Sequence, residues 1–549
     1  MRMLIAKAAK FIGCFLFLVP LQVFATTVVM LHTDFVPQSK VERLKQYAAE
    51  QDVELVSITP AQFNPALLEG VDFLFADTPR MPDRQRLTDA IADIPTELEW
   101  VMLGGGPPTT SEQLDPQSHR MLMGYFLNGT VNNYNAFFQA IDRKVKGLPL
   151  SDLPSPEQVP SYGIYLNEEA VTDINAYLSV MNHSDDKPIV GFVTARNQII
   201  NQEFEPLEHL MNMAQDANVT PVIYYLDDEY GLDWPWQENR PSMLVNMTHL
   251  QQGEERKLEL EALNVPMVQT IHYREGDIEH WRASDVGIEQ RSASVTLATT
   301  ETWGLTDPLI ISADVDDEKV FIPEQMDLLF GRAHSYHRLA TKAVEDKSLA
   351  VMFWNAPAGA ENISASNLNV PRSIASIANG LRNEGFAIPE IKELDMIADA
   401  KELLSGYYQP ETLQSLYDKG YAAALPLRDY LRWYRGVPTA TRHFVNGWWG
   451  HPMRYEGLLQ INGEPAFVFP ILKQGNLWLL PQPPRSGKVG DAIHAVKEPP
   501  NHLFLAAYLW LQKQHESNEL DAWCIWGRTG LKNGRQAKLA VSQEKISLI

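Results

Sequence analysis

Short runs of β-forming residues alternate with amphipathic segments in the first part of this 549-residue chain. The β-like runs cover residues 27–32, 53–58, 71–76 and 100–103, and the helical segments cover residues 41–51 and 84–94. This alternation is typical of a parallel sheet, because a helix must return the chain to the edge where the next strand begins. The sequence therefore predicts an α/β domain over residues 26–150.

Two further units repeat the pattern after a proline-rich linker that contains Pro149, Pro154, Pro156 and Pro160. The second domain is expected over residues 160–345, and the third over residues 346–522. Their expected elements are strand 188–193, helix 206–217 and strand 221–225 in the second, then strand 349–353, loop 355–369 and helix 371–383, which turns at Gly385, in the third. The predicted fold class is α/β, with several Rossmann-like parallel-sheet units in tandem, the last one truncated.

The N-terminal segments follow the order found in a secretory signal peptide. Arg2, Lys7 and Lys10 precede an apolar run over residues 11–23, which ends at the small-residue site Val23-Phe24-Ala25. The run is about a dozen residues long, short of the roughly 20 that span a bilayer. We therefore expect residues 1–25 to be a signal peptide cleaved after Ala25, a periplasmic location, and no membrane span afterwards.

The net charge limits the expected partners, and the cysteine content limits the possible disulfides. The formal net charge is −23, and removal of residues 1–25 makes it more negative, because they carry basic residues and no acidic one. Nucleic acid is therefore not an expected partner. Of the two cysteines, only Cys524 would remain after cleavage, which excludes an intrachain disulfide.

Two glycine-containing segments resemble phosphate sites only in part. Gly104-Gly105-Gly106 follows a predicted strand, but Pro107-Pro108 lack amide donors, so a plain turn is favoured. Arg485-Ser486-Gly487-Lys488 lacks the first glycine of a phosphate loop, and Val489 stands where a hydroxyl would hold magnesium. We expect no nucleotide site in this chain.

Three clusters of side chains that can ligate metals give only weak evidence for a metal site. The crowded acids Asp314, Asp316, Asp317 and Glu318 lack the pattern of a calcium hand. His334 and His337 could share a helix face, and the segment 272–280 is rich in ligand atoms, yet no spacing favours a metal. A solvated turn, a half-buried helix face and a polar loop are the favoured interpretations, and no metal site is predicted.

The last third holds the candidate ligand residues. Trp448-Trp449-Gly450-His451-Pro452 could offer a surface for a flat macrocycle, although a core tryptophan pair that closes a turn is the favoured alternative. Further on, Gln482 and Arg485 lie in a polar loop, and Pro499-Pro500-Asn501-His502 opens a helix with Asn501 as its cap. We expect His502 near solvent and neutral, because the positive end of a helix lowers an imidazole pKa.

These segments resemble the large subunit of the cobaltochelatase and magnesium chelatase family. The similar blocks are Gly163-Ile164-Tyr165, Gly191-Phe192-Val193 with Arg196, residues 351–386 with Asn355, Pro357 and Val370-Pro371-Arg372-Ser373, Trp449-Gly450, Gly475-Asn476, Gln482-Pro483-Pro484-Arg485, and residues 499–510. The resemblance runs from Gly163 to Ala522. It implies a chain that binds a tetrapyrrole for insertion or removal of a divalent metal (Co, Mg or Fe), while separate ATPase subunits hydrolyse ATP.

The candidate tetrapyrrole-binding residues are His502, Gln482, Arg485, Trp449 and His451, and the catalytic residues are unknown. An exported chain would not meet cytoplasmic ATPase partners, so a haem-uptake system is the other expected partner. The open alternatives are a non-catalytic periplasmic protein that binds haem or a corrinoid, and an inert product of a frameshifted gene.

The region after Ala522 departs from the family. The family's run His-x-Gly-Thr-His-Gly, followed by Glu-Trp, is expected there, whereas the chain reads Trp523-Cys524-Ile525-Trp526-Gly527. Codon degeneracy allows a choice of codons for residues 523–534 that changes reading when one nucleotide is restored in front of them. Read in that shifted frame, this choice translates as Met-Val-His-Leu-Gly-Thr-His-Gly-Ser-Gln-Glu-Trp, which contains that run. Residues 523–549 are therefore expected to be an out-of-frame, poorly ordered tail.

Overall fold

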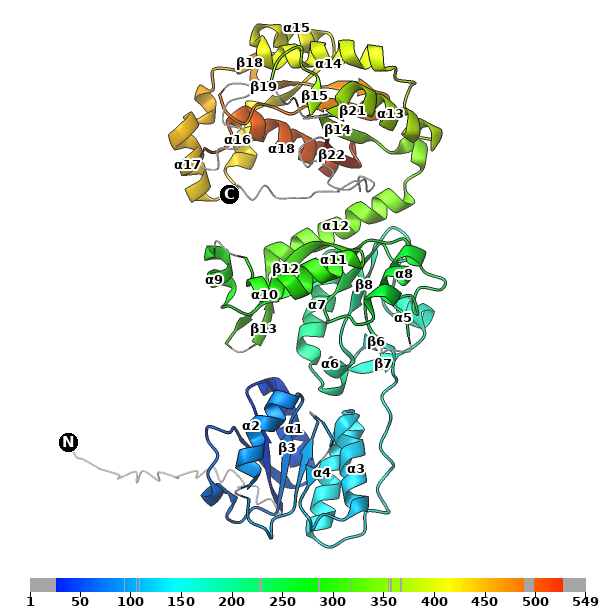
Figure 1. Ribbon diagram of the computed structural model, residues 1–549, viewed down its shortest axis with the longest axis vertical. Coiled ribbons are helices and arrows are strands. Elements are labelled where there is room, and N and C mark those ends of the chain that lie inside the picture. The colour runs from blue at the N-terminus through cyan, green and yellow to red at the C-terminus, as the bar shows by residue number, and fades with distance from the viewer. Residues whose placement is uncertain are drawn as a thin grey trace, which may run out of the picture.

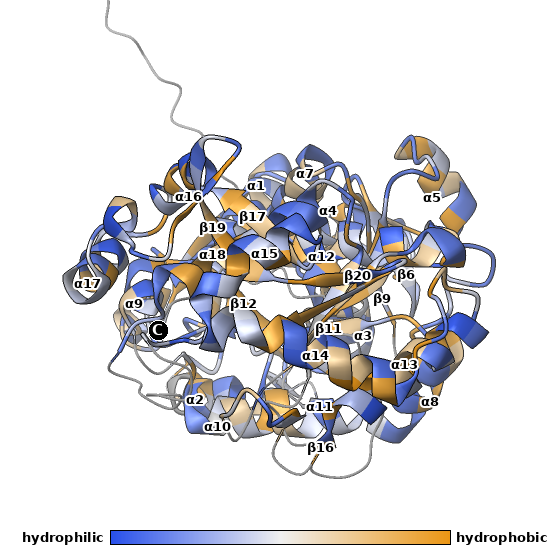
Figure 2. Cartoon of the chain, turned by 90° about the horizontal axis from the view of Figure 1, so that it is seen from above, coloured by the Kyte–Doolittle hydropathy of each residue, from blue (hydrophilic) through white to orange (hydrophobic). Residues whose placement is uncertain are grey.

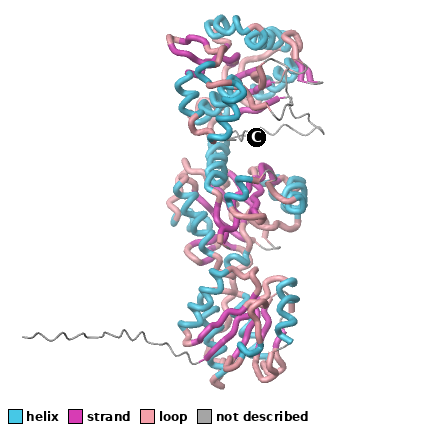
Figure 3. The backbone as a smooth tube through the Cα atoms, turned by 90° about the vertical axis from the view of Figure 1, so that its left-hand side faces the viewer, coloured by secondary structure: helices cyan, strands magenta, loops and turns pink. Residues whose placement is uncertain are grey.

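The chain forms three α/β units stacked end to end, as Figure 1 shows. The computed structural model describes residues 26–526, apart from positions 93, 105, 108, 227–229, 285–286, 317, 354, 356–357, 366–367 and 488–497. In the first and second units, strands run through the middle with helices around them (Figure 3). The predicted α/β fold class is confirmed, with sheets that are mostly parallel but mixed. Among the helices of this described part, none combines the length and apolar character that a bilayer crossing requires.

The first unit is a five-stranded sheet of order β2-β1-β3-β4-β5. Its strands are β1 Thr26–His32, β2 Val53–Ile58, β3 Phe73–Asp77, β4 Trp100–Leu103 and the antiparallel β5 Thr109–Thr110. Its helices are α1 Gln38–Glu50, α2 Met81–Ala92, α3 Pro116–Leu127 and α4 Val131–Val145. Separate apolar clusters fill the two faces of this sheet, which explains the apolar runs 28–31 in β1 and 73–76 in β3.

The second unit is an eight-stranded sheet of order β13-β12-β11-β10-β8-β9-β6-β7. Its strands are β6 Gly163–Leu166, β7 Glu169–Val171, β8 Ile189–Val193, β9 Thr220–Tyr225, β10 Met243–Asn246, β11 Met267–Tyr273, β12 Leu305–Val315 and β13 Glu318–Phe321. Its helices are α5 Ile174–Val180, α6 Arg196–Ile200, α7 Phe204–Asp216, α8 Gly253–Leu263, α9 Ile278–Ala283, α10 Gln290–Ala293, α11 Thr299–Thr302 and α12 Pro323–Thr341. The five central strands are parallel, whereas β6, β7 and β13 pair antiparallel.

The third unit is built on a four-stranded sheet of order β20-β21-β14-β22. The strands of this unit are β14 Leu349–Phe353, β15 Ser364–Ala365, β16 Leu368–Asn369, β17 Ala422–Pro426, β18 Leu459–Ile461, β19 Glu464–Pro470, β20 Leu472–Gln474, β21 Leu477–Pro481 and β22 Ala522–Trp526. Its helices are α13 Val370–Asn383, α14 Glu393–Tyr408, α15 Leu413–Asp418, α16 Leu427–Tyr434, α17 Thr439–Trp449 and α18 His502–Glu516. The predicted turn at Gly385 is confirmed, since its φ of 97° is a left-handed value that side chains disfavour.

Residues 523–526, which the sequence assigned to a poorly ordered tail, continue β22 and pair in parallel with β14. The structure therefore corrects that prediction for these residues. Residues 527–549 lie outside the described part of the chain.

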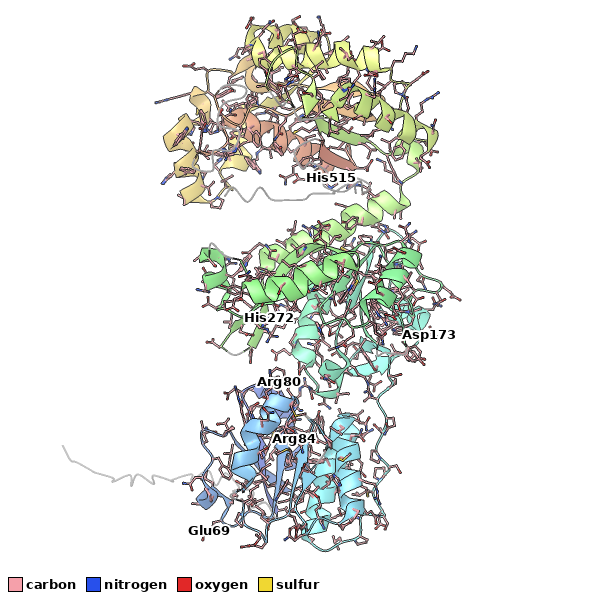
Figure 4. The ribbon with its side chains drawn as sticks, in the orientation of Figure 1. Glu69, Arg80, Arg84, Asp173, His272 and His515 are labelled. Carbon is pink, nitrogen blue, oxygen red and sulfur yellow. The ribbon has the colours of Figure 1, made fainter. Side chains whose placement is uncertain are left out.

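The first and second units are joined by a polar contact at the carboxyl ends of their strands. Lys40 of α1 donates a hydrogen bond to Asp77 at the end of β3 (2.7 Å) and another to Asn201 of the second unit (2.9 Å). Nearby, the Tyr47 hydroxyl donates to Gln202 (2.6 Å). In Figure 4, Arg80 lies on the side of the first unit that faces the second, and His272 on the side of the second that faces the first.

The second and third units are joined through the end of α12. Asp521, which is fully buried before β22, accepts hydrogen bonds from Lys342 (2.7 Å) and from the Ser348 amide (2.8 Å). His515 of α18 contacts Ser335 (3.0 Å) and Arg338 (2.8 Å) on α12. Figure 4 shows His515 on the side of the third unit that faces α12.

Candidate ligand site at the carboxyl edge of the third sheet

The topology of the third sheet marks one place for a ligand. The chain enters the sheet at β14, then adds β21 on one side of it and β22 on the other. The three strands are parallel, so Phe353, Pro481 and Trp526 end at the same edge. Ligands of open α/β sheets bind outside the carboxyl ends of strands where the strand order reverses. The loops that follow β14 and β21 therefore form the candidate site.

Gln482 is the first residue after β21 and lies at this edge. Its backbone amide donates to the carbonyl of Phe353 (2.9 Å), and its side-chain Nε2 donates to the Tyr508 hydroxyl of α18 (3.0 Å). The side chain is buried, and its Oε1 has no hydrogen-bond partner among the described residues. A buried acceptor without a partner costs about 1–3 kcal/mol. The edge of the sheet thus holds a buried acceptor that the described residues leave unsatisfied.

Asn501 fixes the loop that carries Arg485. Its Nδ2 donates to the carbonyls of Pro484 (2.9 Å) and Ser486 (2.7 Å), while its backbone amide donates to the carbonyl of Arg485 (3.0 Å). Its Oδ1 accepts from the Phe504 amide (2.8 Å), which confirms the predicted cap of α18. One side chain therefore both begins the helix and holds the half-buried Arg485 in the loop after β21.

His502 does not lie near solvent, so that expectation is wrong. Its side chain is fully buried, with Nε2 3.0 Å from the carbonyl of Gly450 and Nδ1 2.9 Å from the Tyr430 hydroxyl. Because a carbonyl only accepts, Nε2 carries the proton and Nδ1 accepts from Tyr430. The pKa of His502 is lowered, as the sequence analysis expected. The main cause is burial of the ring and not the positive end of the helix. Both nitrogens are engaged, so His502 joins α16, α17 and α18.

The two tryptophans differ in exposure: one faces solvent, and the other packs against the loop after β21. Trp448 is 52% exposed, whereas Trp449 is half-buried and its Nε1 donates to the carbonyl of Pro499 (2.8 Å). The Trp449 ring lies beside Gly487. His451 is exposed, and its Nδ1 accepts from the Met453 amide (3.3 Å) at the start of a short 3-10 turn, Pro452–Arg454.

The structure thus brings the five predicted ligand residues into one region made by the end of α17, the loop after β21 and the start of α18. It adds two side chains that were not among the candidate ligand residues, Tyr430 and Tyr508. Tyr430 stacks on Tyr434 one helical turn later, with ring centroids 5.5 Å apart. That i, i+4 aromatic spacing in α16 was the available signal, but it identifies a core face rather than a site.

The loop after β14 forms the other side of the sheet edge. Asn355 accepts a hydrogen bond from the Tyr408 hydroxyl of α14 (2.7 Å) and donates to the carbonyl of Gly359 (3.2 Å). Beyond it, a cavity of about 450 Å³ is lined by Glu361, Ile363, Ser364, Leu368, Asn369, Pro371, Ile397 and Lys401. Glu361 and Lys401 form an ion pair at its rim.

The structure also places the weaker motifs. Gly104 has a φ of 81°, and a side chain there would meet the carbonyl of Thr78, so this position requires glycine for a tight turn. Gly105, Pro108, Lys488 and Val489 are outside the described residues.

The histidines and acids that could have held a metal have separate partners. His334 contacts the carbonyl of Ala217 (2.8 Å), and His337 contacts the Ser242 hydroxyl (3.2 Å). His272 contacts Asp314 (2.9 Å), and Asp317 is outside the described residues. Within the described part of the chain, no group of three or more ligating side chains could hold a metal ion.

Comparisons with known proteins agree with this architecture. The profile of the CobN/Magnesium Chelatase family matches residues 123–530. The catalytic subunit of cobaltochelatase from Mycobacterium tuberculosis superposes with a TM-score of 0.66 at 19% identity, over 92% of this chain and 43% of that subunit. This structural likeness shows a shared fold.

Among curated sequences, a magnesium-chelatase subunit of Chlorobaculum parvum is 22% identical over 75% of this chain and 33% of its own length. An uncharacterized protein of Methanocaldococcus jannaschii is 24% identical over 65% of this chain and 32% of its own length. The chain thus spans about a third of the length of these relatives. The family profile covers more than half of the chain, so this protein belongs to the CobN/magnesium chelatase family.

Proposed function

We propose that this chain binds a tetrapyrrole at the carboxyl edge of the third sheet, for insertion or removal of a divalent metal. The metal, which would be Co, Mg or Fe, is a substrate. Membership of the family supports a tetrapyrrole as the ligand. The reversal of strand order at β14 supports the carboxyl edge of this sheet as the binding site. ATP would be hydrolysed by separate subunits, as the resemblance to the family implies, and this agrees with the incomplete phosphate loop in the sequence.

The open acceptor on Gln482 is the observation that carries this proposal. A metal-free tetrapyrrole has pyrrole N–H donors, and the buried Oε1 of Gln482 lacks a donor among the described residues. Arg485, held by Asn501, supplies a guanidinium that suits the carboxylates at the rim of such a macrocycle. Trp449 and the exposed His451 supply an aromatic surface and an imidazole next to it.

Gln482→Leu should therefore weaken the binding of a metal-free porphyrin about tenfold, because a hydrogen bond to a buried group contributes about 1–1.5 kcal/mol. A porphyrin that already holds a metal has no pyrrole N–H, so its affinity should change much less. Titrations followed at the Soret band measure both affinities. The exposed Gln460→Leu is the matched control and should leave both unchanged.

The same titration separates the competing functions. Absence of a Soret shift with every metallated and metal-free macrocycle would exclude tetrapyrrole binding and support an inert product. Binding together with metal transfer supports a chelatase subunit, and binding without transfer supports a haem or corrinoid carrier. Equal losses for both porphyrins in Gln482→Leu would contradict the role given to its Oε1.

We also propose export to the periplasm, which rests on the order of charged, apolar and small residues over positions 1–25. The mature protein, purified from its source, should begin at Thr26, because cleavage is expected after Ala25. Intact-mass spectrometry of the periplasmic fraction measures this directly. A chain that retains Met1 and stays in the cytoplasmic fraction would contradict both the signal peptide and a role in haem uptake.

A further inference from the structure

One segment of the third unit has the opposite charge to the rest of the chain. The whole sequence has 69 acidic and 46 basic residues, yet no acid occurs between Asp429 and Glu456. That interval contains four arginines and two histidines. Arg432 pairs with Asp429, whereas Arg435, Arg442 and Arg454 form no ion pair with a carboxylate of the described residues. A local cationic surface therefore stands out from an acidic protein.

The same segment exposes large apolar side chains. Phe444 is 50% exposed, Trp448 is 52% exposed, and Met453, just beyond α17, is 63% exposed. Phe444 and Trp448 are four residues apart and therefore share a face of α17. Val445 is the buried residue of this helix. Helix α17 lies at the edge of the molecule in two perpendicular views (Figures 1 and 2).

We name this region the α17 surface, made of the exposed residues Arg435, Phe444, Trp448, Met453 and Arg454, whereas Arg442 is half-buried with its Nε inside the fold. The high exposure of its side chains argues against a small molecule as the occupant, because small-molecule sites are concave and enclose most of the ligand. Side chains that are half or more exposed on a helix at the edge of the fold suit a broad surface instead. Aromatic residues on one face of a helix, with arginines around them, are the features by which a helix lies in the interface of a bilayer.

We propose that the α17 surface docks this protein on a membrane that contains anionic lipid. The apolar side chains would enter the boundary between headgroups and acyl chains, and the arginines would attract the lipid phosphates. The negative charge of the remaining chain would be repelled by the same lipids, so docking would be oriented with α17 toward the bilayer. This association is peripheral and does not depend on a bound tetrapyrrole.

Flotation with lipid vesicles tests the proposal on the intact mature chain. It should float with vesicles of mixed phosphatidylcholine and phosphatidylglycerol but not with phosphatidylcholine alone, and high salt should weaken the association. The double variant Phe444→Ser, Trp448→Ser should bind the mixed vesicles at least about tenfold more weakly. The double variant Arg435→Gln, Arg454→Gln should lose the preference for anionic lipid.

Leu394→Ser is the matched control, because Leu394 is 79% exposed on α14 and lies outside the α17 surface. It should bind vesicles like the unmodified chain, and circular dichroism should be the same for all variants. Failure of the unmodified chain to float with mixed vesicles would overturn the proposal and leave a protein as the occupant. The proposal would also be overturned if the Phe444/Trp448 variant kept its vesicle binding but lost its Soret shift with porphyrin, since the surface would then belong to the ligand site.

Discussion

Lys40→Met should lower the free energy of unfolding of the first unit by about 3–5 kcal/mol, because it leaves a buried carboxylate without its counter-ion. Lys40 is 4% exposed and Asp77 is 3% exposed, and they are joined by a 2.7 Å hydrogen bond. Burial by itself would lower the pKa of Lys40, but the adjacent Asp77, together with Tyr134 and Glu203, outweighs it and raises that pKa, so the ammonium is charged at neutral pH. Hydrogen exchange of the β1 and β3 amides measures the loss.

Two variants distinguish this buried pair from a general effect of losing a lysine. Lys45→Met removes a lysine of the same helix whose side chain is 36% exposed and paired with Glu42, and it should change stability by less than about 0.5 kcal/mol. The double variant Lys40→Met, Asp77→Leu removes both charges and should regain much of the loss. If Lys40→Met were no less stable than Lys45→Met, the ion pair would not be a stabilising element.

Lys40 also shows which feature of this fold could not be predicted from the sequence, namely burial by a contact between units. The strands of the first unit were predictable because both sheet faces are covered, which demands apolar runs such as Val28–Leu31 in β1. Lys40 looks like an ordinary surface residue at the start of an amphipathic helix. Its burial depends on Asn201, which is 161 positions away and belongs to another unit. Contacts at that separation leave no periodic trace in the sequence.

The candidate site divides in the same way between local and distant interactions. The cap that Asn501 forms was predictable, because its partner, the Phe504 amide, is three residues away. The open acceptor of Gln482 was not, because it depends on how the loop after β21 packs against α18. The sequence grouped Trp448 with Trp449, yet packing separates them into an exposed and a half-buried ring.

His502→Ala should reduce the free energy of unfolding by about 2–4 kcal/mol, since the change removes a fully buried ring and leaves buried groups without partners. The position of His502 at the start of a helix indicated an exposed and dispensable side chain. Its partners Tyr430 and Gly450 are 72 and 52 residues away, so that local pattern could not reveal the packing. Urea unfolding of the variant and of the unmodified chain measures the difference.

The pH dependence gives this prediction a second measurement. Burial lowers the pKa of His502, so the folded state binds this proton less readily than the unfolded state. Stability should therefore fall as the pH drops below about 6.5, the usual pKa of histidine, and His502→Ala should lose the part of this fall that the residue contributes. The exposed His451→Ala should change stability by less than about 0.5 kcal/mol and should keep the fall in stability at low pH, because the buried His502 remains. If the two substitutions had equal effects on stability, the contacts of His502 with Tyr430 and Gly450 would not be what stabilises the packing of α16, α17 and α18.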